Sequence, residues 1–136
     1  MTGNEQMLNI LLKPHLLGQV SRMENAVGVG CPDIHSFYQG KDYWIELKCH
    51  IRHYDGGMIF DKLRPSQQLW HLKRVKQKGI VYCIVRVGNE ITVYRSMDVR
   101  RVIEAPIERY YVHYERIFCE VKPWDWRDFQ RALYDV

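Results

Sequence analysis

Two acidic residues and one lysine are the residues of this sequence best suited to chemistry. Asp33 precedes Glu46 by thirteen positions, and Lys48 follows Glu46 by two. Carboxylate oxygens are the hard ligands that Mg²⁺ and Mn²⁺ prefer, and a lysine beside them can orient a water molecule or stabilise a developing negative charge. Together these groups could neutralise a phosphate, activate a water and stabilise a leaving oxygen, which are the three requirements of phosphodiester hydrolysis.

The elements that must bring these residues together are two strands joined by a tight turn. Asp33-Ile34 and Tyr43-Trp44-Ile45 are the apolar-rich parts of two predicted strands, and Gln39-Gly40 between them is typical of a turn. If Gln39-Gly40 is a two-residue hairpin loop, Tyr38 pairs with Lys41 and the register of the whole hairpin is set.

In that register Asp33 falls opposite Glu46. Lys48 projects on the same face as Glu46, because side chains alternate along a strand. Directly opposed residues have Cβ atoms roughly 4.5–5.5 Å apart, so two carboxylates placed there repel each other unless a cation lies between them. A slip of one residue would turn Glu46 and Lys48 away from Asp33.

The remaining pattern predicts an α/β domain with a mixed central β-sheet flanked by helices. We expect a single domain over residues 1–136, with a core over about 4–103 and an aromatic C-terminal extension over about 104–136. Asn4 is a candidate cap for the first helix, and Pro14 is unfavourable inside it. The expected helices cover 4–17, 65–78, a short 98–103 and 124–134, and the expected strands cover 19–24, 80–87 and 90–95, with a loop over 50–62.

Composition limits the class of protein. The chain has 136 residues, a net charge of +4 and four widely spaced cysteines without a C-x-x-C pair. These features indicate reduced thiols in a cytoplasmic protein and a mild preference for a polyanionic partner. The N-terminus has no secretory pattern, and no apolar run reaches membrane-spanning length.

Further groups could complete a metal site or bind nucleic acid. The backbone carbonyl of Leu47 could add an oxygen ligand. Glu24 is a candidate metal ligand, and equally a candidate hydrogen-bond partner in a cap or turn. Glu5 is a weaker candidate ligand, because an acidic residue in the first turn of a helix is explained more simply by its favourable interaction with the helix dipole. A basic set could grip phosphates or could be a solvated face; it comprises Arg52, Lys62, Arg64, Lys73 and Arg74.

A zinc site is an alternative for the same region. Cys31 and His35, and likewise Cys49 and His53, are separated by four residues on neighbouring strands. Structural zinc sites usually contain tighter cysteine pairs, so this alternative is the weaker one.

The motif also carries a resemblance. Pro32-Asp33 followed by Glu46-Leu47-Lys48 resembles the PD-(D/E)-x-K nuclease pattern. The runs 25–33 and 44–48 look like the VRR-NUC branch of that superfamily, and Leu63-Arg64-Pro65-Ser66-Gln67-Gln68-Leu69-Trp70 is similar to its L-S-P-x-Q-x-x-W helix start. The resemblance covers about residues 20–87, and small Holliday-junction resolvases are similar in size and element order.

The resemblance implies a restriction-endonuclease-like fold and a Mg²⁺-dependent nuclease, in which Mn²⁺ could substitute. Asp33 and Glu46 would be metal ligands, Lys48 the catalytic lysine and Gln67 an active-site residue on a helix. Relatives often carry an acidic residue on the first helix, a place that Glu5 or Glu24 could fill.

The sequence therefore predicts a Mg²⁺-dependent DNA endonuclease, with branched or structured DNA as the expected substrate. Symmetric cutting of two strands requires two active sites, so a C2 homodimer is expected. The compact format suggests a phage or prophage origin, in the cytoplasm of a bacterial or phage-infected cell. The alternatives are a restriction-type or exonucleolytic DNase, and a non-catalytic nucleic-acid-binding module, which the intact Asp33, Glu46 and Lys48 set disfavours.

Overall fold

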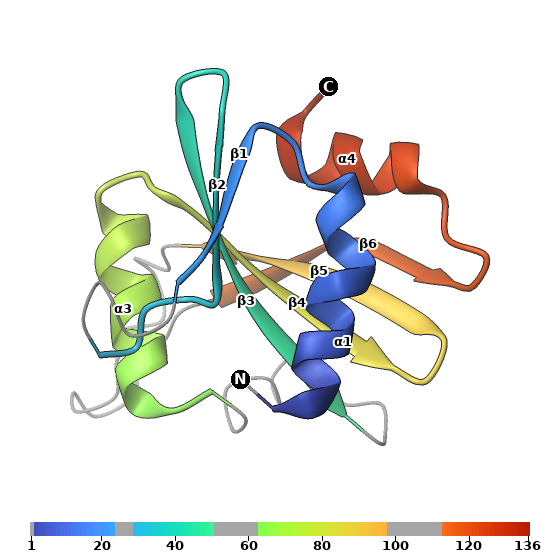
Figure 1. Cartoon of the computed structure of the whole chain (residues 1–136). Helices are drawn as coiled ribbons and strands as arrows, with labels where there is room; N and C mark the ends of the chain where they lie inside the picture. The colour runs from blue at the N-terminus through green and yellow to red at the C-terminus, as the bar shows by residue number, and fades with distance from the viewer. Residues whose placement is uncertain (1, 24–28, 51–62, 98–112) are drawn as a thin grey trace.

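A six-stranded sheet forms the centre of the computed structural model, which describes residues 2–23, 29–50, 63–97 and 113–136 (Figure 1). In chain order the elements are α1 (Gly3–Leu12), the 3-10 turn η1 (Lys13–His15), β1 (Gln19–Arg22), β2 (Ile34–Tyr38), β3 (Lys41–His50), α3 (Pro65–Lys76), β4 (Ile80–Val87), β5 (Glu90–Met97), β6 (His113–Val121) and α4 (Trp126–Tyr134). No helix in these ranges is both long and apolar enough to cross a membrane.

The sheet is mixed, as predicted. Its strands follow the chain order from β1 to β6, and β3 and β4 form a parallel pair while the other neighbours are antiparallel. A parallel pair needs a crossover connection, and α3 lies within the one between β3 and β4. The α/β fold class with a mixed central sheet flanked by helices is therefore confirmed.

The hairpin register is also confirmed. Tyr38 pairs with Lys41, and the ladder continues to Ile34 opposite Ile45. Gln39 and Gly40 have φ values of 50° and 79°, as a two-residue turn with positive φ at both positions requires. Asp33 comes directly before Ile34, the first residue of β2. It therefore lies at the end of the strand that is nearest to Glu46.

The two faces of the sheet are covered by different helices. Along β4, Tyr82 and Ile84 belong to a core cluster that includes residues of α1 and α4, whereas Cys83 and Val85 belong to a second cluster with Leu72 of α3. Alternating residues point to opposite faces, so α1 and α4 lie on one face and α3 on the other. The side chains of Glu46 and Lys48 share the α3 face, because they alternate with the core residues of β3.

The first helix differs from the prediction at both ends. Thr2, and not Asn4, is the N-cap: its hydroxyl accepts a hydrogen bond from the Glu5 N–H at 3.2 Å, and the Glu5 carboxylate accepts one from the Thr2 N–H at 2.7 Å. The α-helix ends at Leu12, and Pro14 lies in the 3-10 turn that follows. Proline has no N–H to continue the helical ladder, which explains the shorter helix.

The C-terminal segment is part of the sheet and of the core. β6, which was not predicted, pairs with β5 along its length. Tyr134 of α4 connects distant segments: its hydroxyl accepts from the Leu17 N–H at 3.1 Å and lies 2.7 Å from the Ser36 hydroxyl. Ser36 donates to the Leu17 carbonyl at 2.7 Å, so Tyr134 is the donor to Ser36. The expected short helix over 98–103 lies outside the described residues, as do residues 51–62 of the expected loop.

Candidate active site

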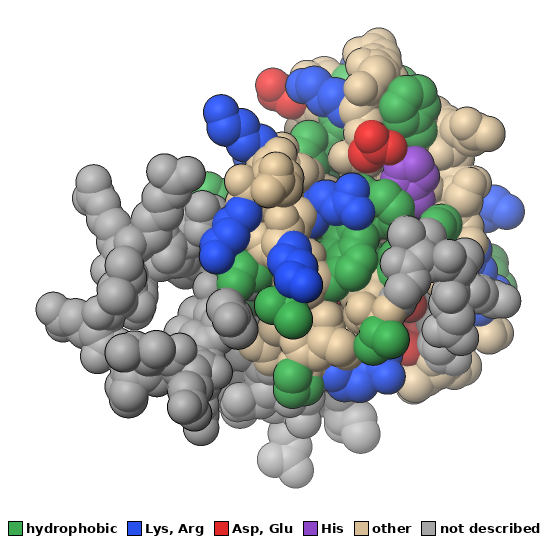
Figure 2. All heavy atoms as spheres, turned by 90° about the vertical axis from the view of Figure 1, so that its left-hand side faces the viewer, with side chains coloured by type: hydrophobic (Ala, Val, Ile, Leu, Met, Phe, Trp, Pro, Cys, Tyr) green, Lys and Arg blue, Asp and Glu red, His purple; other side chains and the backbone are tan. Residues whose placement is uncertain are grey.

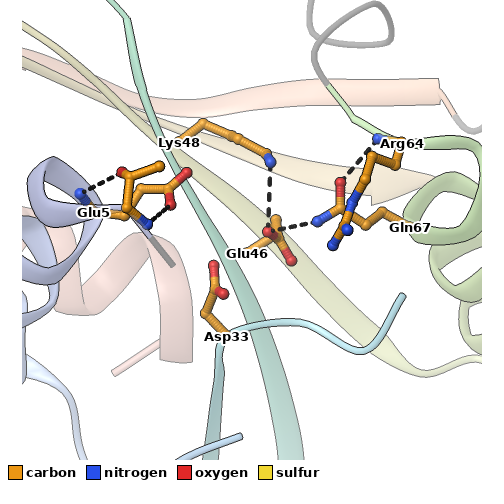
Figure 3. A pocket seen from close by; sticks show the side chains of 7 residues that line it. Glu5, Asp33, Glu46, Lys48, Arg64 and Gln67 are labelled. Carbon is orange, nitrogen blue, oxygen red and sulfur yellow. Dashed lines mark hydrogen bonds and ion pairs between the residues drawn. The ribbon is translucent and has the colours of Figure 1, made fainter. Parts of the chain in front are cut away.

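Three separate segments line one pocket of about 390 Å³. They are the start of α1, the β2–β3 hairpin and the start of α3. Asp33, Lys48 and Gln67 all point toward Glu46 at its centre (Figure 3). The lining residues are Thr2, Glu5, Asp33, Glu46, Lys48, Arg64 and Gln67.

Glu46 is a buried carboxylate with one oxygen bound and one oxygen without a partner. Its residue surface is 2 % exposed. Oε1 accepts a hydrogen bond from Gln67 Nε2 at 3.1 Å and lies 3.7 Å from Lys48 Nζ. Oε2 is buried and has no hydrogen-bond partner within the described residues. An unpaired buried carboxylate oxygen is costly, so this atom indicates a missing positively charged or hydrogen-bonding ligand.

Asp33 is held by the backbone of the neighbouring strands. Its Oδ2 accepts from the Leu47 N–H at 2.9 Å, and its own carbonyl accepts from the Met23 N–H at 2.8 Å. The N–H and C=O of one strand residue point to the same side, so the Leu47 carbonyl also faces the side on which Asp33 lies. The Asp33 carboxylate also lines the pocket beside Glu46.

The electrostatics of Glu46 are those of a carboxylate that lacks a cation. Burial and the nearby Asp33 charge raise the pKa of Glu46 to about 9, and Lys48 offsets only part of this rise. At neutral pH the carboxyl therefore holds a proton in the absence of other ligands. A cation between the two carboxylates would reverse this preference and favour the ionised pair.

The start of α3 is positioned by a bond network and by a close backbone approach. Gln67, which is 4 % exposed, accepts from the Arg64 N–H at 2.9 Å while its amide donates to Glu46. Gly30 lies against this turn with a φ of +86°, and a Cβ on it would be 2.2 Å from the Ser66 carbonyl oxygen. Only glycine allows this approach, which places α3 against the segment that leads to Asp33.

The donor set fits a magnesium ion better than a metal held entirely by protein ligands. No group of three or more His, Cys, Asp or Glu side chains in the described ranges is arranged to hold a metal ion. Mg²⁺ usually keeps several waters and binds through one or two carboxylates, and Asp33, the unpaired oxygen of Glu46 and the Leu47 carbonyl match that need.

The other predicted site residues differ in whether the structure places them at the pocket. Glu5 lines the pocket, but the Thr2 backbone occupies one oxygen of its carboxylate. Arg64 lines the pocket, and Lys73 and Arg74 lie in the last turn of α3. Outside the described residues are Glu24, Arg52 and Lys62.

Sequence reasoning missed Thr2. The T-x-x-E spacing of Thr2 and Glu5 is a capping-box signature that could have placed both residues at the start of a helix. It could not have shown that this helix end opens into the pocket.

The zinc alternative involves residues that have other partners. His35 Nε2 lies 2.6 Å from Asp42 Oδ1, and the Cys49 thiol donates to the Asn4 carbonyl at 3.5 Å. Burial and the Glu46 charge raise the pKa of the Cys31 thiol, which disfavours the thiolate form that zinc requires. His53 lies outside the described residues.

Comparison with known proteins finds similarity at the level of the fold. No family model matches the sequence, and no curated protein matches it. Among solved structures, the fold is similar to Hjc, a Holliday junction resolvase from the archaeal hyperthermophile Archaeoglobus fulgidus, with a TM-score of 0.44 and 16 % identity over 69 % of this chain and 74 % of that chain. Because this similarity is distant, the functional assignment of this chain depends on its own site residues.

Proposed function

We propose that this chain is a metal-dependent endonuclease that hydrolyses phosphodiester bonds of DNA, with Mg²⁺ as its cofactor. The observation that carries the proposal is the convergence of Asp33 and Glu46 beside Lys48 in one pocket, with Glu46 Oε2 buried and unpaired. Two carboxylates and a lysine that meet in a pocket suit the neutralisation of a phosphate and the activation of a water.

The proposal divides the work among metal ligands, a residue that positions Glu46 and a lysine. Asp33, Glu46 and the Leu47 carbonyl would hold the metal. When bound, Mg²⁺ would neutralise phosphate charge and lower the pKa of a bound water. Gln67 holds Glu46 in place through the 3.1 Å bond to Oε1. Lys48, whose side chain is 15 % exposed, orients the attacking water or stabilises the developing charge.

Branched DNA is the proposed substrate, following the resemblance to resolvases. A resolvase cuts two strands symmetrically, so we also propose a C2 homodimer with one pocket in each subunit. A purely monomeric protein that still cuts branched DNA would favour the exonucleolytic or restriction-type DNase instead.

The test compares cleavage of labelled DNA by the wild type, by Glu46→Gln and by the matched control Glu115→Gln. Glu115 is exposed on β6 and lies outside the pocket lining, so its variant makes the same chemical change elsewhere. The substrates are a four-way junction, a flap and a plain duplex, each with Mg²⁺ and with EDTA.

We expect Mg²⁺-dependent cleavage that Glu46→Gln reduces by roughly 10²–10³-fold, the size of losing one key electrostatic group, and that Glu115→Gln leaves intact. If no substrate is cut in the presence of Mg²⁺, the nuclease proposal fails. If Glu46→Gln cuts as fast as the wild type, the site assignment fails.

A further inference from the structure

The Arg74 side chain lies against two tryptophan rings at its end and against Gly79 along its stem. Its guanidinium carbon lies 5.0 Å from the Trp44 ring centroid and 4.6 Å from that of Trp70, and the two indoles meet edge to face at 5.1 Å. Both distances fall within the range of cation–π attraction. Its stem lies against Gly79, where an added Cβ would be 2.5 Å from Arg74 Cγ. We call Arg74, Trp44 and Trp70 the arginine clamp.

The clamp orders the guanidinium without using its hydrogen-bond donors. No ion pair or hydrogen bond joins the Arg74 side chain to another described residue, although a guanidinium offers five N–H donors. On the same sheet face, the Asp42 carboxylate is bound by His35 at 2.6 Å. An ordered guanidinium whose donors are not used by the described residues is complementary to an oxyanion, which it can bind in a bidentate manner.

The clamp lies on the same face as the pocket. Trp44 precedes Glu46 by two residues on β3, and Arg74 follows Gln67 by seven residues on α3. Seven residues are two helical turns, or about 10 Å along the axis, which corresponds to roughly three steps of a duplex at about 3.4 Å each. This side of the molecule shows Lys and Arg side chains grouped around hydrophobic ones (Figure 2).

We propose that the arginine clamp is a second phosphate subsite, at which Arg74 binds a backbone phosphate of the DNA strand roughly three steps from the phosphodiester that enters the pocket. The subsite rests on the proposed function, because the strand that it positions is the substrate. A half-buried guanidinium that is already ordered loses little side-chain entropy on binding, so the clamp fixes the strand at a defined distance from Glu46.

The experiment measures the affinity for a labelled duplex and a labelled four-way junction in EDTA, over a series of salt concentrations. Each phosphate contact contributes about 0.9 to the slope of log affinity against log salt. Arg74→Gln is expected to reduce the magnitude of this slope by about 0.9. The matched control Arg127→Gln removes the same charge from an exposed position on α4, on the other sheet face, and is expected to leave the slope unchanged.

Arg74→Met is a second variant that should remain folded, since its apolar side chain can keep the contact with both indoles and with Gly79. It should show the same reduced slope as Arg74→Gln. If Arg74 only packs against the tryptophans, both variants will keep the wild-type slope, whatever their melting temperatures, and the subsite is overturned.

The outcomes separate the subsite from the nuclease function. Cleavage by the wild type together with equal slopes would overturn the subsite alone. A reduced slope without Mg²⁺-dependent cleavage would overturn the nuclease function alone. A wild-type protein that neither binds DNA nor cuts it in the presence of Mg²⁺ would overturn both.

Discussion

Glu46 is the residue on which the chemistry of the pocket depends most. It combines three properties that ordinary surface carboxylates lack: near-complete burial, a neighbouring carboxylate and one oxygen without a hydrogen-bond partner among the described residues. Lys48 at 3.7 Å compensates only part of the charge. Perturbed carboxylates of this kind occur mainly at functional sites, where a ligand or a proton supplies what the protein leaves out.

The raised pKa of Glu46 predicts an unusual pH dependence of stability in the metal-free protein. The carboxyl has a pKa of 4.5 when unperturbed and about 9 in the fold. Between these values the folded chain keeps a proton that the unfolded chain releases, so the contribution of Glu46 to stability is present below the lower value and is lost as the pH rises toward the higher one.

Chemical denaturation in EDTA between about pH 5 and about pH 9 checks this prediction. Glu46→Gln carries no such proton, so its stability relative to the wild type should increase as the pH rises. Parallel stability curves for the two proteins would show that Glu46 is ionised in the metal-free fold.

At the scale of elements, the site depends on how closely the start of α3 approaches Gly30. Gly30 and Gly40 both have positive φ, +86° and +79°, but only Gly30 faces backbone atoms: its added Cβ would be 2.2 Å from the Ser66 oxygen, whereas Gly40 has nothing within 4 Å. Alanine substitutions at these two glycines therefore separate the cost of positive φ from the cost of a steric clash.

We predict that Gly30→Ala destabilises the protein by roughly 1–3 kcal/mol more than Gly40→Ala, since a backbone clash adds an overpacking penalty to the shared cost of positive φ. Gly30→Ala should also slow cleavage, because displacing the start of α3 moves Gln67 away from Glu46. Urea denaturation and cleavage rates of the two variants provide the measurement. Equal destabilisation by both substitutions would mean that the contact with Ser66 is unimportant.

The local elements of the site were largely predictable from sequence, and the contacts between elements were not. Gln39-Gly40 fixes its own turn and hence the hairpin register, because the positive φ values are local requirements. Gln67 contacts Glu46 across 21 positions of the sequence, and Thr2 reaches the pocket only through the packing of α1 against β3. β6 was missed because its sequence mixes charged and apolar residues without a clean alternation.

At the scale of the whole molecule, the C-terminal segment supplies part of the common core. Phe118 of β6 and Phe129, Leu133 and Tyr134 of α4 belong to the same cluster as Leu8 and Leu12 of α1. Loss of a single such aromatic side chain typically costs about 3–5 kcal/mol, compared with total stabilities of about 5–15 kcal/mol.

We therefore propose that residues 1–136 form one cooperative unit, and we predict that a chain ending at residue 112 does not fold. Thermal unfolding followed by circular dichroism should show a single transition for the full chain and none for the truncated one. Removal of the two exposed residues Asp135 and Val136 serves as the control and should leave the transition in place. A cooperative transition in the truncated chain would establish an independent N-terminal core.

The bond between Tyr134 and Ser36 has a consequence for the order of events during biosynthesis. It joins residues 98 positions apart, and the bond from Leu17 to Tyr134 spans 117 positions. Contacts of such large sequence separation form late, because a long loop must close before they contribute. The strand that leads from Asp33 is thus secured only after residue 134 has left the ribosome. A chain still being synthesised would lack an assembled pocket, so the proposed hydrolytic activity would begin only when translation of this segment is complete.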